Sequence, residues 1–183
     1  MSRFSITLEG QVFRRQYLVY VIEIISNGRR YFYVGQTGDR KYTTARPPFR
    51  RLMGHFEDTS KSTQNQIYRY IATDVLSIPQ ARQRETFTDD IKQRVEDFLV
   101  TSTVRMHVYP LEPFVPGITH AEHMAVLGRV EELERHVIRC FIDAHLPLGN
   151  RNFHRPSTPS PPYLEVLQEI ERDFELSSLH PAG

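Results

Sequence analysis

The hydrophobic positions in the first part of the chain follow the pattern of strands joined by a turn. The run Tyr17–Ile25 is β-branched and aromatic, and it is too short to favour a helix. Ser26-Asn27-Gly28 has turn chemistry, and a second apolar run follows at Arg30–Gly35. We expect a β-hairpin whose first strand is apolar on both faces and therefore lies at the centre of a sheet.

Apolar residues spaced three or four apart predict four helices farther along the chain. These span Phe49–Phe56, with an apolar face of Phe49, Leu52, Met53 and Phe56, then Gln64–Leu76, Thr88–Leu99 and Thr119–Ala144. Between the last two helices, Val104, Met106 and Val108 alternate with polar residues. This alternation predicts a third strand near the edge of the sheet, and we expect Pro110 to cut it short.

The C-terminal part has a different composition from the rest. Residues 156–162 are rich in proline and serine and predict a linker, followed by one short acidic helix. Its apolar face consists of Leu164, Leu167, Ile170 and Phe174. The order of elements predicts an α+β fold: a small three-stranded mixed or antiparallel sheet flanked by helices, with a C-terminal helical appendage. We expect one domain over residues 1–155 and the linker with its helix over residues 156–183.

The composition is that of a globular protein. Of the 183 residues, 39% are hydrophobic and 25% are charged, which excludes a disordered chain and a membrane protein as classes. The one cysteine, Cys140, excludes an intramolecular disulfide and a cysteine-rich zinc site. The chain has no apolar leader and no run of about 18 apolar residues, so we expect a cytoplasmic protein without membrane contact.

Charge is unevenly distributed along the chain, although the net charge is only +1. Residues 29–51 hold seven Lys/Arg and one acid, Asp39, whereas residues 156–183 hold one cation and five acids. Twenty of the 23 cations are arginine, whose planar fork donates paired hydrogen bonds to phosphate. The basic segment is therefore a candidate phosphate-binding region.

Two short segments of the predicted hairpin resemble a known motif pair. Leu18-Val19-Tyr20 and Tyr33-Val34-Gly35 are similar to the GIY and YIG elements of the GIY-YIG nucleases. Farther along, Arg51 and His55 stand four residues apart, as on that family's first helix, and Glu134 resembles its metal-binding glutamate. Asn150 resembles an asparagine that follows this helix in many members. The resemblance covers about residues 17–155.

This chain also departs from the family pattern. Leu18 replaces the usual glycine, and insertions are expected at about residues 38–50 and 77–103. Glycine is required at such a position only if the backbone needs a positive φ. We expect Gly35 and Asn150 to be structural residues near the site.

The resemblance implies a metal-dependent endonuclease that hydrolyses phosphodiester bonds in DNA, with Tyr20, Tyr33, Arg51, His55 and Glu134 as catalytic residues. Glu134 would bind Mg²⁺ or Mn²⁺, hard cations that take oxygen ligands. Either Tyr20 or His55 is the general base. A tyrosine serves as base at neutral pH only if a cation lowers its pKa, and Arg51 is the candidate for that cation.

Several alternatives stay open at this level. Glu131 and Glu132 compete with Glu134 for the metal role, and His120 with His123 forms a weak zinc motif without the i, i+4 spacing. The same fold can serve as a nucleic-acid-binding module that does not cleave. A third alternative is an adaptor whose basic front binds an acidic protein.

The leading hypothesis is a stand-alone endonuclease of the site-specific restriction type, acting on duplex DNA. We expect contacts to phosphates or bases from four cations of the basic segment: Arg40, Lys41, Arg46 and Arg50. An enzyme that cuts both strands is expected to be a homodimer, and the apolar face of the C-terminal helix is the predicted dimer surface.

Overall fold

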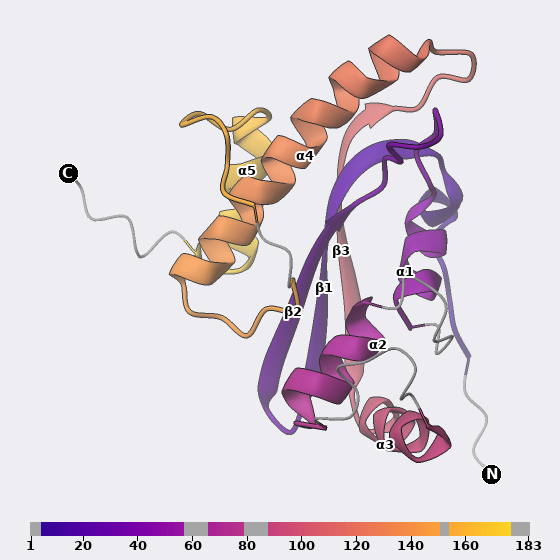
Figure 1. The fold of residues 1–183 in the computed structure, drawn as a ribbon, viewed down its shortest axis with the longest axis vertical. Coiled ribbons are helices and arrows are strands. Elements are labelled where there is room, and N and C mark those ends of the chain that lie inside the picture. Colours follow the sequence, from indigo (N-terminus) through magenta and orange to yellow (C-terminus); the bar gives the residue numbers. More distant parts are fainter. Residues whose placement is uncertain (1–4, 57–65, 79–87, 151–153, 177–183) are drawn as a thin grey trace.

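The computed structural model describes residues 5–56, 66–78, 88–150 and 154–176, and Figure 1 shows its elements. The strands are β1 (Gln16–Ser26), β2 (Arg29–Gln36) and β3 (Thr103–Pro113). The helices are η1 (Gly10–Phe13), α1 (Pro48–Phe56), α2 (Gln66–Tyr70), η2 (Ile71–Val75), α3 (Asp89–Val100), α4 (His120–Asp143) and α5 (Leu164–Asp173). This α+β architecture confirms the predicted fold class. None of the described helices is both long and apolar enough to cross a membrane.

The sheet is antiparallel, with the order β2-β1-β3. β1 is the central strand, as its continuous burial pattern predicts. The turn to β2 uses Asn27 and Gly28, both at positive φ (50° and 74°), a backbone conformation that matches the twist of the two strands. The sheet is therefore centred on the strand that carries Tyr20.

Pro110 does not end the third strand, contrary to the prediction. β3 continues to Pro113, and Pro110 pairs with Leu18 next to a shift in the register. Leu18 pairs with Pro110 and Tyr17 with Glu112, so Leu111 is an extra residue in β3. Proline is tolerated here because β3 is an edge strand and carries a bulge.

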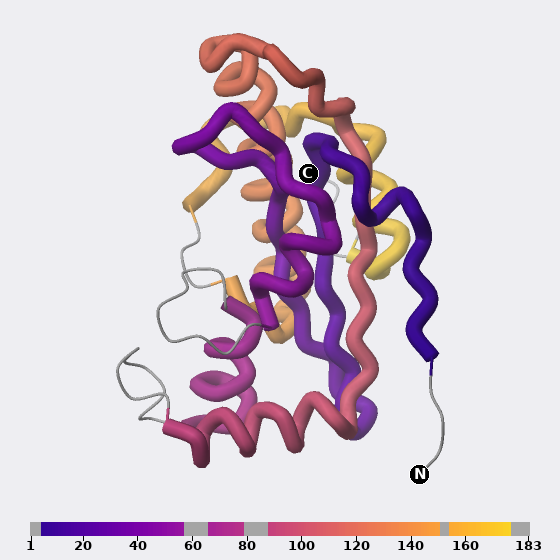
Figure 2. The backbone as a smooth tube through the Cα atoms, turned by 90° about the vertical axis from the view of Figure 1, so that its right-hand side faces the viewer, coloured from indigo at the N-terminus to yellow at the C-terminus, as the bar shows by residue number. Residues whose placement is uncertain are grey.

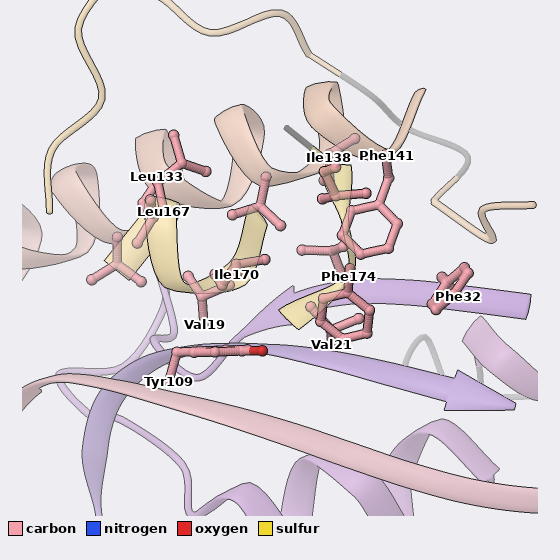
Figure 3. Close-up of a cluster of buried hydrophobic side chains, with 14 of the residues drawn as sticks. Val19, Val21, Phe32, Tyr109, Leu133, Ile138, Phe141, Leu167, Ile170 and Phe174 are labelled. Atoms are coloured by element: carbon pink, nitrogen blue, oxygen red, sulfur yellow. The ribbon is translucent and has the colours of Figure 1, made fainter. Parts of the chain in front are cut away.

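Helices cover both faces of the sheet (Figures 1 and 2). Val19, Val21 and Phe32 on one face pack under α4 and α5 in a cluster shown in Figure 3. Leu18, Tyr20 and Ile22 on the opposite face form a second cluster beneath α1, α2 and α3. The period of two along β1 thus places Tyr20 on the α1 side.

The predicted helices are found with small differences in their bounds. Thr119 forms a capping box with Glu122 at the start of α4, and Thr88 caps α3. The predicted helix 64–76 is split into α2 and the π-helical η2, and residues 64 and 65 lie outside the described part. Met53 was expected on the apolar face of α1 but is 56% exposed, so that part of the prediction is wrong.

The C-terminal helix packs within the main core, which buries most of the apolar face that was predicted as a dimer surface. Leu167, Ile170 and Phe174 are buried together with Val21 and Phe141, and only Leu164 on the predicted face is exposed. An intramolecular core already covers the apolar face of α5. The fold therefore leaves little of this face available to a second copy.

The predicted linker before α5 is hydrogen-bonded to α4. The Glu132 carboxylate accepts hydrogen bonds from the backbone N–H and the hydroxyl of both Ser157 and Thr158, at 2.6 to 3.1 Å. These bonds and Arg135 outweigh burial and lower the pKa of Glu132 to about 2. On β3, the Tyr109 hydroxyl donates to Asp173 at 2.7 Å and ties the end of α5 to the sheet.

The burial of α5 predicts that two side-chain truncations on this helix lower the free energy of unfolding by very different amounts. Ile170→Ala should lower the free energy of unfolding by about 2–5 kcal/mol, because Ile170 is fully buried. Leu164→Ala on the same helix is the control and should change it little, since Leu164 is 52% exposed. Urea denaturation measures both values. Equal effects of the two substitutions would contradict the packing of α5.

Candidate functional site

The site is built around Tyr20, which lies directly opposite Gly35 in the β1–β2 pairing. The Tyr20 phenol lies over the backbone of Gly35, where a Cβ atom would collide with its hydroxyl group and ring. Any larger residue at this position would displace the phenol. Tyr33 lies two residues before Gly35 on the same strand, so its side chain is on the same face as the Tyr20 ring.

Helix α1 brings His55 and Arg51 to the two tyrosines. The Tyr20 hydroxyl and His55 Nε2 are 2.6 Å apart and share a buried hydrogen bond. The His55 ring also packs against Tyr33, with centroids 4.5 Å apart. Arg51 is one turn earlier on the same helix face. Its Nε atom is buried and has no hydrogen-bond partner among the described residues.

Glu134 of α4 completes the group. It influences the pKa values of Tyr20, Tyr33 and Arg51, so the four residues lie in one electrostatic environment. Among the described residues, its carboxylate has no hydrogen bond or close ion pair. Burial raises the pKa of Glu134 to about 7, and Arg51 opposes this shift. The site therefore holds a partly desolvated carboxylate beside a cation and two phenols.

The structure separates Glu134 from its two competitors on α4. Glu131 accepts two hydrogen bonds from Arg40, with Nε at 2.7 Å from Oε1. The Glu132 carboxylate is occupied by Ser157, Thr158 and Arg135. Of the three carboxylates, Glu134 alone forms no hydrogen bond or close ion pair with another described residue.

Arg51 acts on the pKa of Tyr20 in the expected direction, but burial outweighs it. Burial raises the pKa of Tyr20, and Arg51 and Arg46 only partly oppose this. Burial also raises the pKa of Tyr33 well above its usual range, and Tyr20 and Glu134 add to the shift. Both phenols are therefore protonated at neutral pH, and Tyr20 cannot act as a preformed tyrosinate base.

Asn150 fixes the outer edge of β2 beside the site. Its Nδ2 donates to the Val34 carbonyl at 2.7 Å, and its Oδ1 accepts from the Val34 N–H at 2.9 Å. The Gly149 N–H donates to the Phe32 carbonyl at 2.8 Å, so the chain after α4 pairs with this edge. Asn150 thereby holds the strand segment between Tyr33 and Gly35, which makes it a positioning residue.

The four predicted DNA-binding cations differ in their surroundings. Lys41 and Arg50 are exposed. Arg40 is paired with Glu131, and Arg46 donates to Asp39 at 2.6 Å. Arg46 also acts on the pKa of Tyr20, which places it closer to the site than sequence position suggests. The insertion at residues 38–50 thus contributes one cation, Arg46, that acts electrostatically on Tyr20, whereas residues 79–87 of the second insertion lie outside the described part.

His123, part of the weak zinc motif, is a buried structural residue. Its Nε2 donates to the Asp39 carbonyl at 2.8 Å, because a carbonyl can only accept. Its Nδ1 then accepts from the Tyr17 hydroxyl at 2.6 Å. Both ring nitrogens are used, and no group of three or more metal-ligating side chains is present in the part of the chain that the structure describes.

Two positioning residues, Asp39 and Thr37, were missed from the sequence. The Asp39 carboxylate accepts from the N–H groups of Lys41 and Tyr42 and from Arg46, and so shapes the loop. The Thr37 hydroxyl donates to the Gln16 carbonyl at 2.7 Å and anchors the start of the loop to β1. The lone acid within a basic segment was the one available signal for Asp39.

Leu18, which stands where the GIY element of the resembling motif has glycine, occupies its position without backbone strain. It is fully buried in the α1-side core and is not among the residues with positive φ. A side chain is therefore acceptable at this position. The close approach that requires glycine occurs instead at Gly35.

Gly35→Ala should disturb the site and destabilise the protein. The added methyl group would collide with the Tyr20 phenol, and overpacking of this kind costs about 1–3 kcal/mol. Gly128→Ala on α4 is a control with open space, and it should leave stability unchanged or raise it by up to about 1 kcal/mol. Urea denaturation gives both values, and an unchanged free energy of unfolding for Gly35→Ala would contradict the close contact.

The raised pKa of Glu134 predicts a pH-dependent gain in stability on removing its charge. The folded pKa is about 7 and the usual value is 4.5, so the carboxylate destabilises the folded state as pH rises between them. Glu134→Gln should raise the thermal midpoint above pH 7 but have little effect below pH 4.5. Thermal denaturation at several pH values, in the presence of a chelator, measures the midpoint. Glu96→Gln is the control, because Glu96 is an exposed residue of α3. A midpoint lowered by Glu134→Gln above pH 7 would contradict the desolvation.

No protein-family model, no curated protein and no solved structure matches this chain.

Proposed function

We propose that this protein is a GIY-YIG-type endonuclease that hydrolyses phosphodiester bonds in DNA with the help of Mg²⁺ or Mn²⁺. One observation carries the proposal: the Tyr20 hydroxyl is bonded to His55 Nε2 at 2.6 Å, beside Arg51 and Glu134. Phosphodiester hydrolysis needs an activated water, a cation on the phosphate and stabilisation of the leaving oxygen. Each of these tasks has a candidate group here.

Water activation would use Tyr20 and His55 together. With neutral His55 accepting at Nε2, the Tyr20 hydroxyl donates its proton to the imidazole. As the water attacks phosphorus, its proton passes to the Tyr20 oxygen while the Tyr20 proton passes to His55. This relay needs no free tyrosinate, so the raised pKa of Tyr20 does not prevent it. His55 is then the final base and Tyr20 the group that contacts the water.

Arg51 would bind the scissile phosphate. Burial lowers its pKa, but Tyr20, Tyr33 and Glu134 outweigh this, so the guanidinium stays charged. Its buried Nε–H lacks an acceptor among the described residues, and a phosphate oxygen would supply one. A guanidinium also suits phosphate because it can donate two parallel hydrogen bonds.

Glu134 would hold the metal ion together with the substrate phosphate. Its carboxylate fits this role because it is a hard oxygen donor without a close protein partner among the described residues. Magnesium often binds through one or two carboxylates and the substrate, so a single protein ligand is sufficient. A bound divalent cation would neutralise charge on the scissile phosphate or on the leaving oxygen.

Conservative substitutions test the proposed chemistry on supercoiled plasmid with Mg²⁺. Tyr20→Phe keeps the ring and removes the relay, so the cleavage rate should fall about 10²–10⁴-fold, and Glu134→Gln should abolish metal-dependent cleavage. Tyr42→Phe is the matched control, since Tyr42 is an exposed tyrosine, and it should cleave normally.

The outcome separates the nuclease from the non-cleaving module on the same fold. Binding of DNA without cleavage by the unmodified protein would favour the module. Full cleavage by both Tyr20→Phe and Glu134→Gln would contradict the assigned chemistry. Circular dichroism of each variant checks that the lost rate does not reflect unfolding.

A further inference from the structure

The segment before β1 lies beside the helix that carries Arg51. The short helix η1 packs next to α1 (Figure 1), and the rings of Phe13 and Phe49 have centroids 5.2 Å apart. Arg14 follows Phe13 directly, and Arg50 follows Phe49. One ring contact therefore joins two chain segments that each continue into an arginine, and the residue after Arg50 is Arg51 of the site.

The charges at this contact are not neutralised by the protein. Arg14 and Arg50 are both exposed, and neither forms an ion pair within the described ranges. By contrast, the three arginines of α4, Arg129, Arg135 and Arg139, each bond a carboxylate. Neither η1 nor α1 contains an acidic residue, and the positive end of the α1 dipole adds to the same potential. This surface is therefore suited to an anionic partner.

We propose that η1 and the start of α1 form a second contact surface for the DNA duplex, in which Arg14 and Arg50 bind backbone phosphates that flank the one held by Arg51. The inference rests on the proposed nuclease function and extends it from the cleaved bond to the path of the duplex. Phosphates follow one another closely along each strand, so a duplex held at Arg51 presents further charges to its neighbours. The Phe13–Phe49 contact holds together the two chain segments that carry these arginines.

A protein partner is the competing occupant, because Phe13 and Met53 beside this surface are 53% and 56% exposed. Two observations favour nucleic acid: the absence of acids in η1 and α1, and two cations without ion pairs among the described residues. An apolar protein interface is typically depleted of charge at its centre.

The experiment measures the salt dependence of binding by the full chain to a fluorescein-labelled duplex, in a chelator so that the DNA stays intact. Arg14→Gln combined with Arg50→Gln should reduce the slope of log K against log salt by about 1.8, since each phosphate contact contributes roughly 0.9. The matched control combines Arg155→Gln, in the segment before α5, with Arg172→Gln on α5; both residues are exposed and lie outside the basic segment 29–51, and this pair should keep the parent slope.

The outcomes distinguish this inference from the proposed function. If the parent binds duplex and the Arg14/Arg50 variant keeps its slope, the second surface is wrong while the nuclease proposal survives. If the parent does not bind duplex at any salt concentration, the proposed substrate itself fails. A variant that keeps the slope but changes the sedimentation coefficient would assign the surface to a protein partner and overturn the inference. Thermal midpoints equal to the parent's confirm that both variants are folded.

Discussion

The close contact between the Tyr20 phenol and the backbone of Gly35 is the constraint on which the candidate site depends. It fixes where the phenol lies, and the bond from its hydroxyl to His55 Nε2 then fixes α1 relative to the sheet. Arg51 reaches the same place because it is one turn away on that helix. A side chain at position 35 would thus change the geometry of groups that it does not itself touch.

The rest of the fold supports this contact from the side of β2. Asn150 bonds both backbone groups of Val34, while the long helix α4 carries Glu134 and, through His123 and Asp39, holds the loop that follows β2. The same helix is anchored by the sheet core and by α5. Residues far apart in the chain are thereby held at one place, as a preorganised site requires.

The site also has an energetic cost. Burial raises the pKa values of Tyr20 and Glu134, so ionised forms are disfavoured where a nuclease would need charge. The hydrogen bond to His55 gives the Tyr20 proton an acceptor, and a cation would compensate the charge of Glu134. Local destabilisation at a functional site of this kind is offset by the two packed clusters on either face of the sheet.

The sequence alone determined the order of the strands and the long helices, because apolar runs, alternation and a period of 3.6 report burial directly. Tertiary structure alone decided that, of the three glutamates compared on α4, Glu134 has no bonding partner among the described residues, that Arg46 acts on the pKa of Tyr20 and that α5 belongs to the core. It also decided the direction of the tyrosine pKa shifts. These properties depend on which distant groups share a partly buried space, and a local pattern of residues carries no information about that.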